Sequence, residues 1–165
     1  MAFGFNLENH DYRLVQKTNK IFDGLMKGCY CLIIHVRKYS KIKIGKLGFI
    51  EFKRGIYVYI GSAMNSLNLR LKRHLRYEKK LHWHVDYLLR SENAKILDII
   101  YNTEKKVECE LSDYLKGKAC GIEGFGCSDC ECESHLYYFK NRKEAIECVK
   151  NAYDSIAMQC GFFKI

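Results

Sequence analysis

The first part of the chain carries apolar residues in the patterns that β-strands show. Residues 29–36, CYCLIIHV, are a short and almost continuous apolar run, which predicts a buried strand. Gly45 and Gly48 mark a turn within the region that follows. Three further runs rich in β-forming side chains predict strands at residues 41–44, 49–52 and 56–60.

After residue 61 the apolar period becomes helical. Leu67, Leu71 and Leu75 are four apart and form one apolar stripe, and Arg70 and His74 share a neighbouring stripe. The elements expected next are helices at 81–90, 108–116 and 143–160, strands at 94–101 and 136–139, and an ordered loop rich in glycine and cysteine at 117–135. This order predicts an α+β fold, with a small, mainly antiparallel or mixed sheet flanked by helices.

Length and composition predict one globular domain over residues 1–165, in which residues 1–24 form an N-terminal extension. The chain has 165 residues, 48% of them hydrophobic, and contains no proline. No apolar run approaches the ~20 residues of a membrane-spanning helix, and no secretory signal is visible, so we expect a cytoplasmic protein without membrane association. The oligomeric state does not follow from the sequence.

Positive charge is concentrated in one segment of a basic chain. The formal net charge is +9, and residues 70–80 hold six cations against the single acid Glu78. These cations are Arg70, Lys72, Arg73, Arg76, Lys79 and Lys80. With Trp83 close by, the segment predicts a nucleic-acid-binding face, and DNA is the expected partner. The alternative is an ordinary solvated helix face.

Two short signatures nearly overlap in RGIYVYIGSA, residues 54–63. Gly55-Ile56-Tyr57 and Tyr59-Ile60-Gly61 lie on one predicted strand, where Tyr57 and Tyr59 point to the same face. Another Gly-x-Tyr, Gly28-Cys29-Tyr30, opens the buried strand at 29–36. The side chain of Cys29 is expected on the face opposite to that of Tyr30.

Together with RLKRH, HWHVDYLL, ECEL and GFGCSDCECESHLYYF, these signatures resemble the GIY-YIG nuclease superfamily, and within it a small prokaryotic branch. The resemblance covers a core at 27–116 and extends to about residue 139. It identifies Gly28-Cys29-Tyr30 as the first signature, Tyr59-Ile60-Gly61 as the second, and the literal Gly55-Ile56-Tyr57 as a decoy. The chain departs from the family in the 28 residues that separate Tyr30 from Tyr59, an insertion expected to add strands and to cap the site or reshape its DNA groove.

The resemblance implies a metal-dependent DNA endonuclease that acts in repair or recombination. Its catalytic residues would be Tyr30, Tyr59, Arg70, His74 and Glu108. A tyrosine would orient or deprotonate water, the arginine would hold the scissile phosphate, and the histidine would assist positioning or proton transfer. Glu108 would bind Mg²⁺ or Mn²⁺. Glu110 is two positions further along the predicted helix, so both carboxylates cannot face one site.

HWHVDYLL admits two interpretations. His82 and Asp86 are four apart, which fits a histidine oriented by an aspartate, and Trp83 would stack on a base. The alternative is a capped helix that packs Trp83 into the core.

The segment CSDCECESH predicts a Cys₃His zinc site formed by Cys127, Cys130, Cys132 and His135. The related branch pattern does not require Cys127. Packed or redox-active thiols are the alternative, because the chain holds nine cysteines.

Three functions therefore follow from the sequence. The first is the endonuclease, and the second is a non-catalytic nucleic-acid-binding module on the same fold. The third is a zinc or thiol protein that acts through its cysteine-rich loop.

Overall fold

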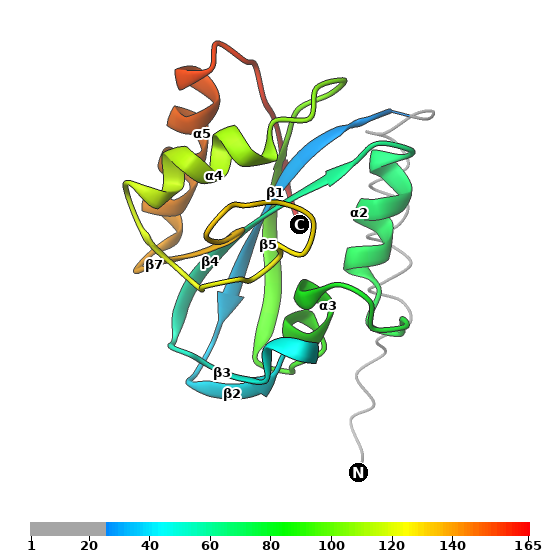
Figure 1. Cartoon of the computed structure of the whole chain (residues 1–165), viewed down its shortest axis with the longest axis vertical. Helices are drawn as coiled ribbons and strands as arrows, with labels where there is room; N and C mark the ends of the chain where they lie inside the picture. The colour runs from blue at the N-terminus through cyan, green and yellow to red at the C-terminus, as the bar shows by residue number, and fades with distance from the viewer. Residues whose placement is uncertain (1–25) are drawn as a thin grey trace.

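A six-stranded antiparallel sheet forms the centre of the fold, in a computed structural model that describes residues 26–165 (Figure 1). Its strands are β1 (Gly28–Val36), β4 (Gly55–Ala63), β5 (Ala94–Tyr101), β6 (Cys120–Gly121), β7 (Leu136–Phe139) and β8 (Gly161–Lys164). They lie side by side in the order β6-β7-β4-β1-β5-β8. With four α-helices in the described part of the chain, this is the predicted α+β fold.

Strand β1 lies in the interior of the sheet and pairs with β4 along its whole length. The register places Tyr30 opposite Gly61, so the two separate signatures lie next to one another on adjacent strands. Gly61 is needed for this contact, because a Cβ atom at this position would lie 2.5 Å from the Tyr30 hydroxyl oxygen.

The two faces of the sheet carry separate apolar cores. Tyr30, Leu32 and Tyr59 point to one face, whereas Cys29 and Cys31 point to the other, as the alternation along a strand predicts. Helices α2 (Leu67–Leu75) and α3 (His84–Leu89) cover the tyrosine face. Helices α4 (Glu108–Lys116) and α5 (Arg142–Ser155) cover the cysteine face (Figure 1).

The insertion between the signatures forms a small hairpin of its own. Its strands are β2 (Ser40–Lys43) and β3 (Phe49–Phe52), joined by the 3₁₀ turn Gly45–Leu47. The hairpin leaves the sheet where β1 ends and returns where β4 begins, at the end of these strands remote from Tyr30 and Gly61. The extra strands are therefore present as expected, but they do not cap the paired signatures.

Two predicted helices are shorter than expected, and one strand was not predicted. The helix predicted at 81–90 is shorter, because Asp86 binds the backbone before His84 and starts the helix there. The helix predicted at 143–160 ends at Ser155, since Ala157 adopts a positive φ of 52°. The chain then forms β8, which sequence patterns did not reveal. The predicted N-terminal extension, residues 1–24, lies outside the described residues.

Among residues 26–165, none of the helices combines the length and the apolar character needed to cross a membrane.

Candidate functional site

Three of the predicted catalytic side chains meet on the tyrosine face of the sheet. The Tyr30 hydroxyl oxygen lies 2.6 Å from Nε2 of His74, which α2 places above β1. The Tyr59 ring lies 6.4 Å from the Tyr30 ring and 6.2 Å from the His74 ring, measured between centroids. Tyr30 and His74 are 44 residues apart in the sequence. The pairing of β1 with β4 and the packing of α2 bring them together.

Burial controls the protonation of this cluster. It raises the pKa of both tyrosines, although the positive charge of Arg70 opposes that effect, and it lowers the pKa of His74 to about 3. The imidazole is therefore neutral at neutral pH, and both phenols keep their protons. Tyr30 is fully buried, whereas 7% of Tyr59 is exposed, and no described residue hydrogen-bonds to the Tyr59 hydroxyl.

One polar atom of the cluster has no partner among residues 26–165. Nδ1 of His74 is buried and makes no hydrogen bond to any described residue, whichever tautomer the imidazole adopts. Leaving a buried polar atom unpaired costs about 1–3 kcal/mol. Such atoms are few in native proteins, and a catalytic role, a bound water molecule and a bound ion are among their explanations.

We expect the stability of the protein to depend on pH through His74. The imidazole takes up a proton near pH 6.5 in the unfolded chain but only near pH 3 in the folded protein. Its contribution is therefore fully present above about pH 6.5 and is lost as the pH falls toward 3. Urea unfolding at pH 7 and pH 4.5 should show a loss of roughly 2–3 kcal/mol that the His74→Gln variant does not show. An equal loss in both proteins would show that His74 is not held neutral.

The guanidinium groups of Arg70 and Arg73 both stack on the indole of Trp83. Their guanidinium carbons lie 4.0 Å and 4.2 Å from the centroid of the Trp83 ring. Nη1 of Arg70 also donates a hydrogen bond to the Ser62 carbonyl oxygen at 3.1 Å. These three side chains line an open pocket of about 460 Å³ that also contains Asp129. Trp83 therefore supports the two arginines, and its faces are less available to a base than its sequence context predicts.

Asp86 holds Arg73 and the backbone next to Trp83 in place through hydrogen bonds. Its carboxylate is fully buried and accepts two hydrogen bonds from Arg73, at 2.8 and 2.9 Å. It also accepts the backbone N–H groups of His82 and Trp83. Burial would raise the pKa of Asp86, but these hydrogen bonds lower it below its usual value. Of the two interpretations of HWHVDYLL, the capped helix is therefore confirmed: Asp86 caps the start of α3, and its side-chain partner is Arg73 and not the His82 imidazole.

The basic segment divides into cations with internal partners and cations that face solvent. Lys79 donates to the Arg73 and His74 carbonyl oxygens and so closes the C-terminal end of α2, while Arg73 binds Asp86. Arg76 and Lys80 are exposed, and Lys72 is half-buried. The segment thus supplies fewer free charges than a count of cations predicts.

Glu108 is the first residue of α4, as the sequence predicts. Its side chain is 16% exposed, and Oε1 lies 3.3 Å from Nζ of Lys106. The negative charge of Glu108 makes a smaller addition to the burial that raises the pKa of Tyr30 and Tyr59. Glu110 is exposed, in keeping with its different direction on the helix.

A second cluster of reactive side chains joins α4 to the cysteine-rich loop. The ligand atoms of Cys109, Cys130, Cys132 and His135 all lie within 4.8 Å of one another. Three of these residues belong to the predicted zinc set, but Cys109 takes the place of Cys127. The Cys127 thiol lies beside the cluster: it donates to the Phe125 carbonyl oxygen and also interacts with Cys130. The only sequence signal for Cys109 was its position next to Glu108 in ECEL.

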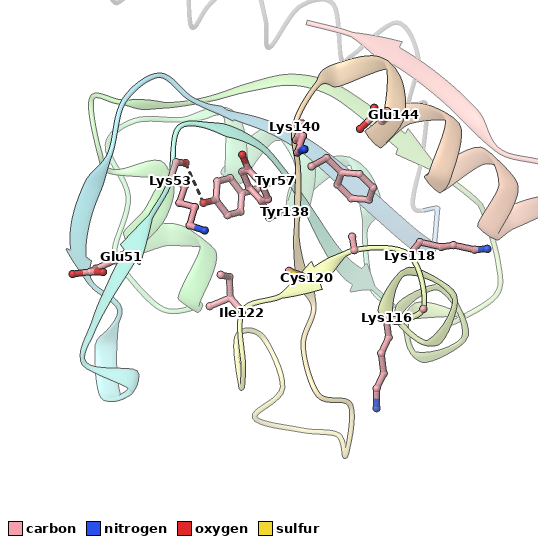
Figure 2. Close-up of a pocket in the computed structure, with 13 residues that line it drawn as sticks. Glu51, Lys53, Tyr57, Lys116, Lys118, Cys120, Ile122, Tyr138, Lys140 and Glu144 are labelled. Carbon is pink, nitrogen blue, oxygen red and sulfur yellow. Dashed lines mark hydrogen bonds between the residues drawn. The ribbon is translucent and has the colours of Figure 1, made fainter.

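The literal Gly55-Ile56-Tyr57 lies beside a different pocket, of about 780 Å³. Tyr57 donates its hydroxyl proton to the Lys53 carbonyl oxygen at 3.1 Å and packs against Tyr138 (Figure 2). The lysines that line this pocket are Lys53, Lys116, Lys118 and Lys140. None of the predicted catalytic residues lines it, so Tyr57 is separate from the Tyr30–His74 cluster.

Fold and site thus define an α+β protein with a buried tyrosine–histidine cluster, an arginine–tryptophan pocket and a cysteine–histidine cluster. The chain belongs to the family described as a domain of unknown function, DUF123, which matches residues 29–158. No curated protein and no solved structure matches the chain.

Proposed function

We propose that the protein is a metal-dependent endonuclease of the GIY-YIG type that hydrolyses phosphodiester bonds in DNA. The observation that carries the proposal is the contact of Tyr30 with His74 across the paired signatures, beside Tyr59 and Arg70. Glu108 acts electrostatically on the same tyrosines from another helix. The five residues, spread over positions 30 to 108, follow the order that the resemblance implies, and this order supports the proposal.

Arg70 is the residue best placed to bind the scissile phosphate. It is half-buried, lines the open pocket, and is held in place by Trp83 and by the Ser62 carbonyl oxygen. A planar guanidinium fixed in this way presents its remaining N–H groups to phosphate oxygens without a further loss of side-chain freedom. Its charge would also stabilise the additional negative charge of the transition state.

The two tyrosines are suited to different tasks. No described residue hydrogen-bonds to the Tyr59 hydroxyl, so this group is available to orient a water molecule. The Tyr30 hydroxyl is already bonded to His74 and fully buried, so it positions the imidazole and the neighbouring Tyr59 ring. His74, whose pKa is lowered to about 3, is a weak proton acceptor, so its task is to position the Tyr30 hydroxyl.

Glu108 is the carboxylate that would hold a divalent cation. A single carboxylate fits Mg²⁺ or Mn²⁺, which keep several water molecules as ligands. The present partner of Glu108, Lys106, is 57% exposed and can move away at little cost. A cation bound here would neutralise phosphate charge and polarise a bound water molecule.

A DNA-binding module without catalysis is the second candidate function. It is favoured by the complete burial of Tyr30 and by the internal partners of Arg73 and Lys79. Such a module would use Arg70 and the exposed cations Arg76 and Lys80 to bind the phosphate backbone, and its affinity would fall steeply with salt.

Cleavage of labelled DNA separates the two candidates. Single-stranded, duplex, flap and branched-junction DNA should be incubated with the protein in Mg²⁺, Mn²⁺ or EDTA. We expect cutting only with a metal ion, and a loss of at least about 100-fold in the Glu108→Gln variant, whose DNA binding is retained. Glu110→Gln is the matched control, because its carboxylate is exposed on the same helix.

If the protein binds DNA in a salt-sensitive way but cuts none of the substrates, the non-catalytic binding module would be established instead. Equal cutting by wild type and Glu108→Gln would remove Glu108 from the site. Neither binding nor cutting would leave the cysteine–histidine cluster as the functional centre.

A further inference from the structure

We propose that Cys109, Cys130, Cys132 and His135 form a structural zinc site that binds helix α4 to the cysteine-rich loop and, through His135, to strand β4. This site is distinct from the magnesium or manganese position proposed at Glu108. Zinc binding itself does not depend on the nuclease activity proposed above; only its consequence for Glu108 does.

The donor atoms have the chemistry and the spacing of such a site. Three thiols and one imidazole are a common ligand set for tetrahedral structural zinc. Zinc–sulfur bonds of about 2.3 Å place two sulfur atoms about 3.8 Å apart around a tetrahedral ion. All four donor atoms here lie within 4.8 Å of one another, and Sγ of Cys130 is 3.2 Å from Nε2 of His135. Small rotations of the cysteine side chains would therefore complete the tetrahedron.

The imidazole of His135 is already oriented for metal binding. Its Nδ1 atom lies 3.2 Å from the Ile60 carbonyl oxygen, which can only accept a hydrogen bond. Nδ1 must therefore carry the proton, and the lone pair of Nε2 points toward the thiols. Metal-bound histidines are held in this way by a hydrogen bond from the second ring nitrogen.

The backbone around His135 prevents the ring from moving away. His135 is buried, with 2% of its surface exposed. A Cβ atom added at Gly126 would lie 2.9 Å from Cβ of His135, so the loop passes directly against this residue. The Gly126 N–H donates to Nδ1 of His84 at 2.9 Å, which ties the loop to α3 as well.

The site would connect segments that lie far apart in the sequence. Cys109 belongs to the first turn of α4, directly after Glu108, and Ile60 lies between Tyr59 and Gly61 in β4. A metal ion bound by Cys109 and His135 would therefore link the Glu108 end of α4 to β4 next to Tyr59. On the proposed function, this link sets the position of the metal-binding carboxylate relative to the tyrosines.

The metal content of the full chain, purified without chelators and in reductant, tests the proposal. We expect about one zinc ion per chain. Cobalt replacing the zinc should give the visible bands of tetrahedral Co²⁺ and a thiolate-to-cobalt charge-transfer band. Adding zinc to metal-free protein should slow amide hydrogen exchange in residues 107–112 and 127–136, but not in α5.

Cys109→Ser, Cys132→Ser and His135→Gln should each weaken zinc binding by more than the roughly 100-fold upper range seen when only an outer partner is lost. Cys127→Ser is the matched control, since this thiol is in the same loop but is not one of the four donor atoms, and the variant should keep the zinc. Metal binding is read by titration of the folded wild type, so a variant that fails to fold does not decide the result.

Zinc below a tenth of an equivalent, together with no tight uptake by the reduced metal-free protein, would overturn the proposal. So would equal loss in the Cys127→Ser control, or full retention in Cys109→Ser. Each of these outcomes is independent of DNA cleavage, so failure of the zinc site and failure of the proposed nuclease can be distinguished.

Discussion

Replacing Arg70 by alanine is expected to lower metal-dependent DNA cleavage by about 10²–10³-fold, the usual effect of removing one transition-state donor. Arg70 is the only one of the predicted catalytic residues, among those described, that lines the arginine–tryptophan pocket. Its loss removes a charge that the structure holds in place through Trp83 and Ser62. Arg70→Lys should rescue little of the activity, because a lysine keeps the charge but loses the planar fork and the stacking on Trp83.

Single-turnover cleavage rates and DNA affinities measured on the same substrate separate the two contributions of Arg70. The cleavage rate should fall much further than the affinity, since one phosphate contact among several contributes modestly to binding. Arg76→Ala is the matched control: this exposed cation in the same segment should change the salt dependence of binding but not the cleavage rate. A similar loss of rate in both variants would mean that Arg70 acts only through bulk charge.

Replacing Asp86 by asparagine is expected to lower the free energy of unfolding by about 3 kcal/mol. The buried carboxylate binds Arg73 through both oxygens and accepts two backbone N–H groups at the start of α3. Breaking a buried ion pair costs about 3–5 kcal/mol, and the partial exposure of Arg73, 25%, places the loss at the lower end. Differential scanning calorimetry should show a Tm lowered by roughly 6–12 °C.

Asp113→Asn provides the control for Asp86. Asp113 is exposed on α4, so the same change of charge there should alter stability by no more than about 0.5 kcal/mol. The Asp86→Asn variant should also lose cleavage activity beyond its loss of stability, because Trp83 and hence Arg70 are released. Wild-type activity in a folded Asp86→Asn protein would show that Arg70 does not need this support.

Much of the fold follows from local patterns in the sequence. Helix α4 begins and ends at the predicted residues, and β1 differs by one residue, because apolar period and glycine positions are local properties. The end of α5 and the strand β8 were missed, since they depend on the positive φ at Ala157 and on pairing with β5. Pairing between distant segments has no local signature, and short strands are recognised least well.

In the candidate sites, too, local motifs were predicted from the sequence and contacts between distant segments were not. The motifs identified the strand of Tyr30 as the partner of the strand that carries the second signature. The contact of Tyr30 with His74 agrees with that interpretation. They could not show that Asp86 binds Arg73 or that Cys109 joins the cysteine-rich loop, because both contacts depend on how helices pack. The number of cations likewise does not show which of them bind other groups of the protein and which face solvent.

The position of β1 between β4 and β5 has a consequence for synthesis on the ribosome. This strand is made first among those described, yet its second neighbour is complete only when Tyr101 has been added. At about 5–20 residues per second, the apolar segment CYCLIIHV would wait on the order of several seconds for that partner. During this interval its exposed edge can pair with another nascent chain. We therefore expect the yield of native protein to depend on the rate of translation and on the availability of chaperones that bind extended apolar segments.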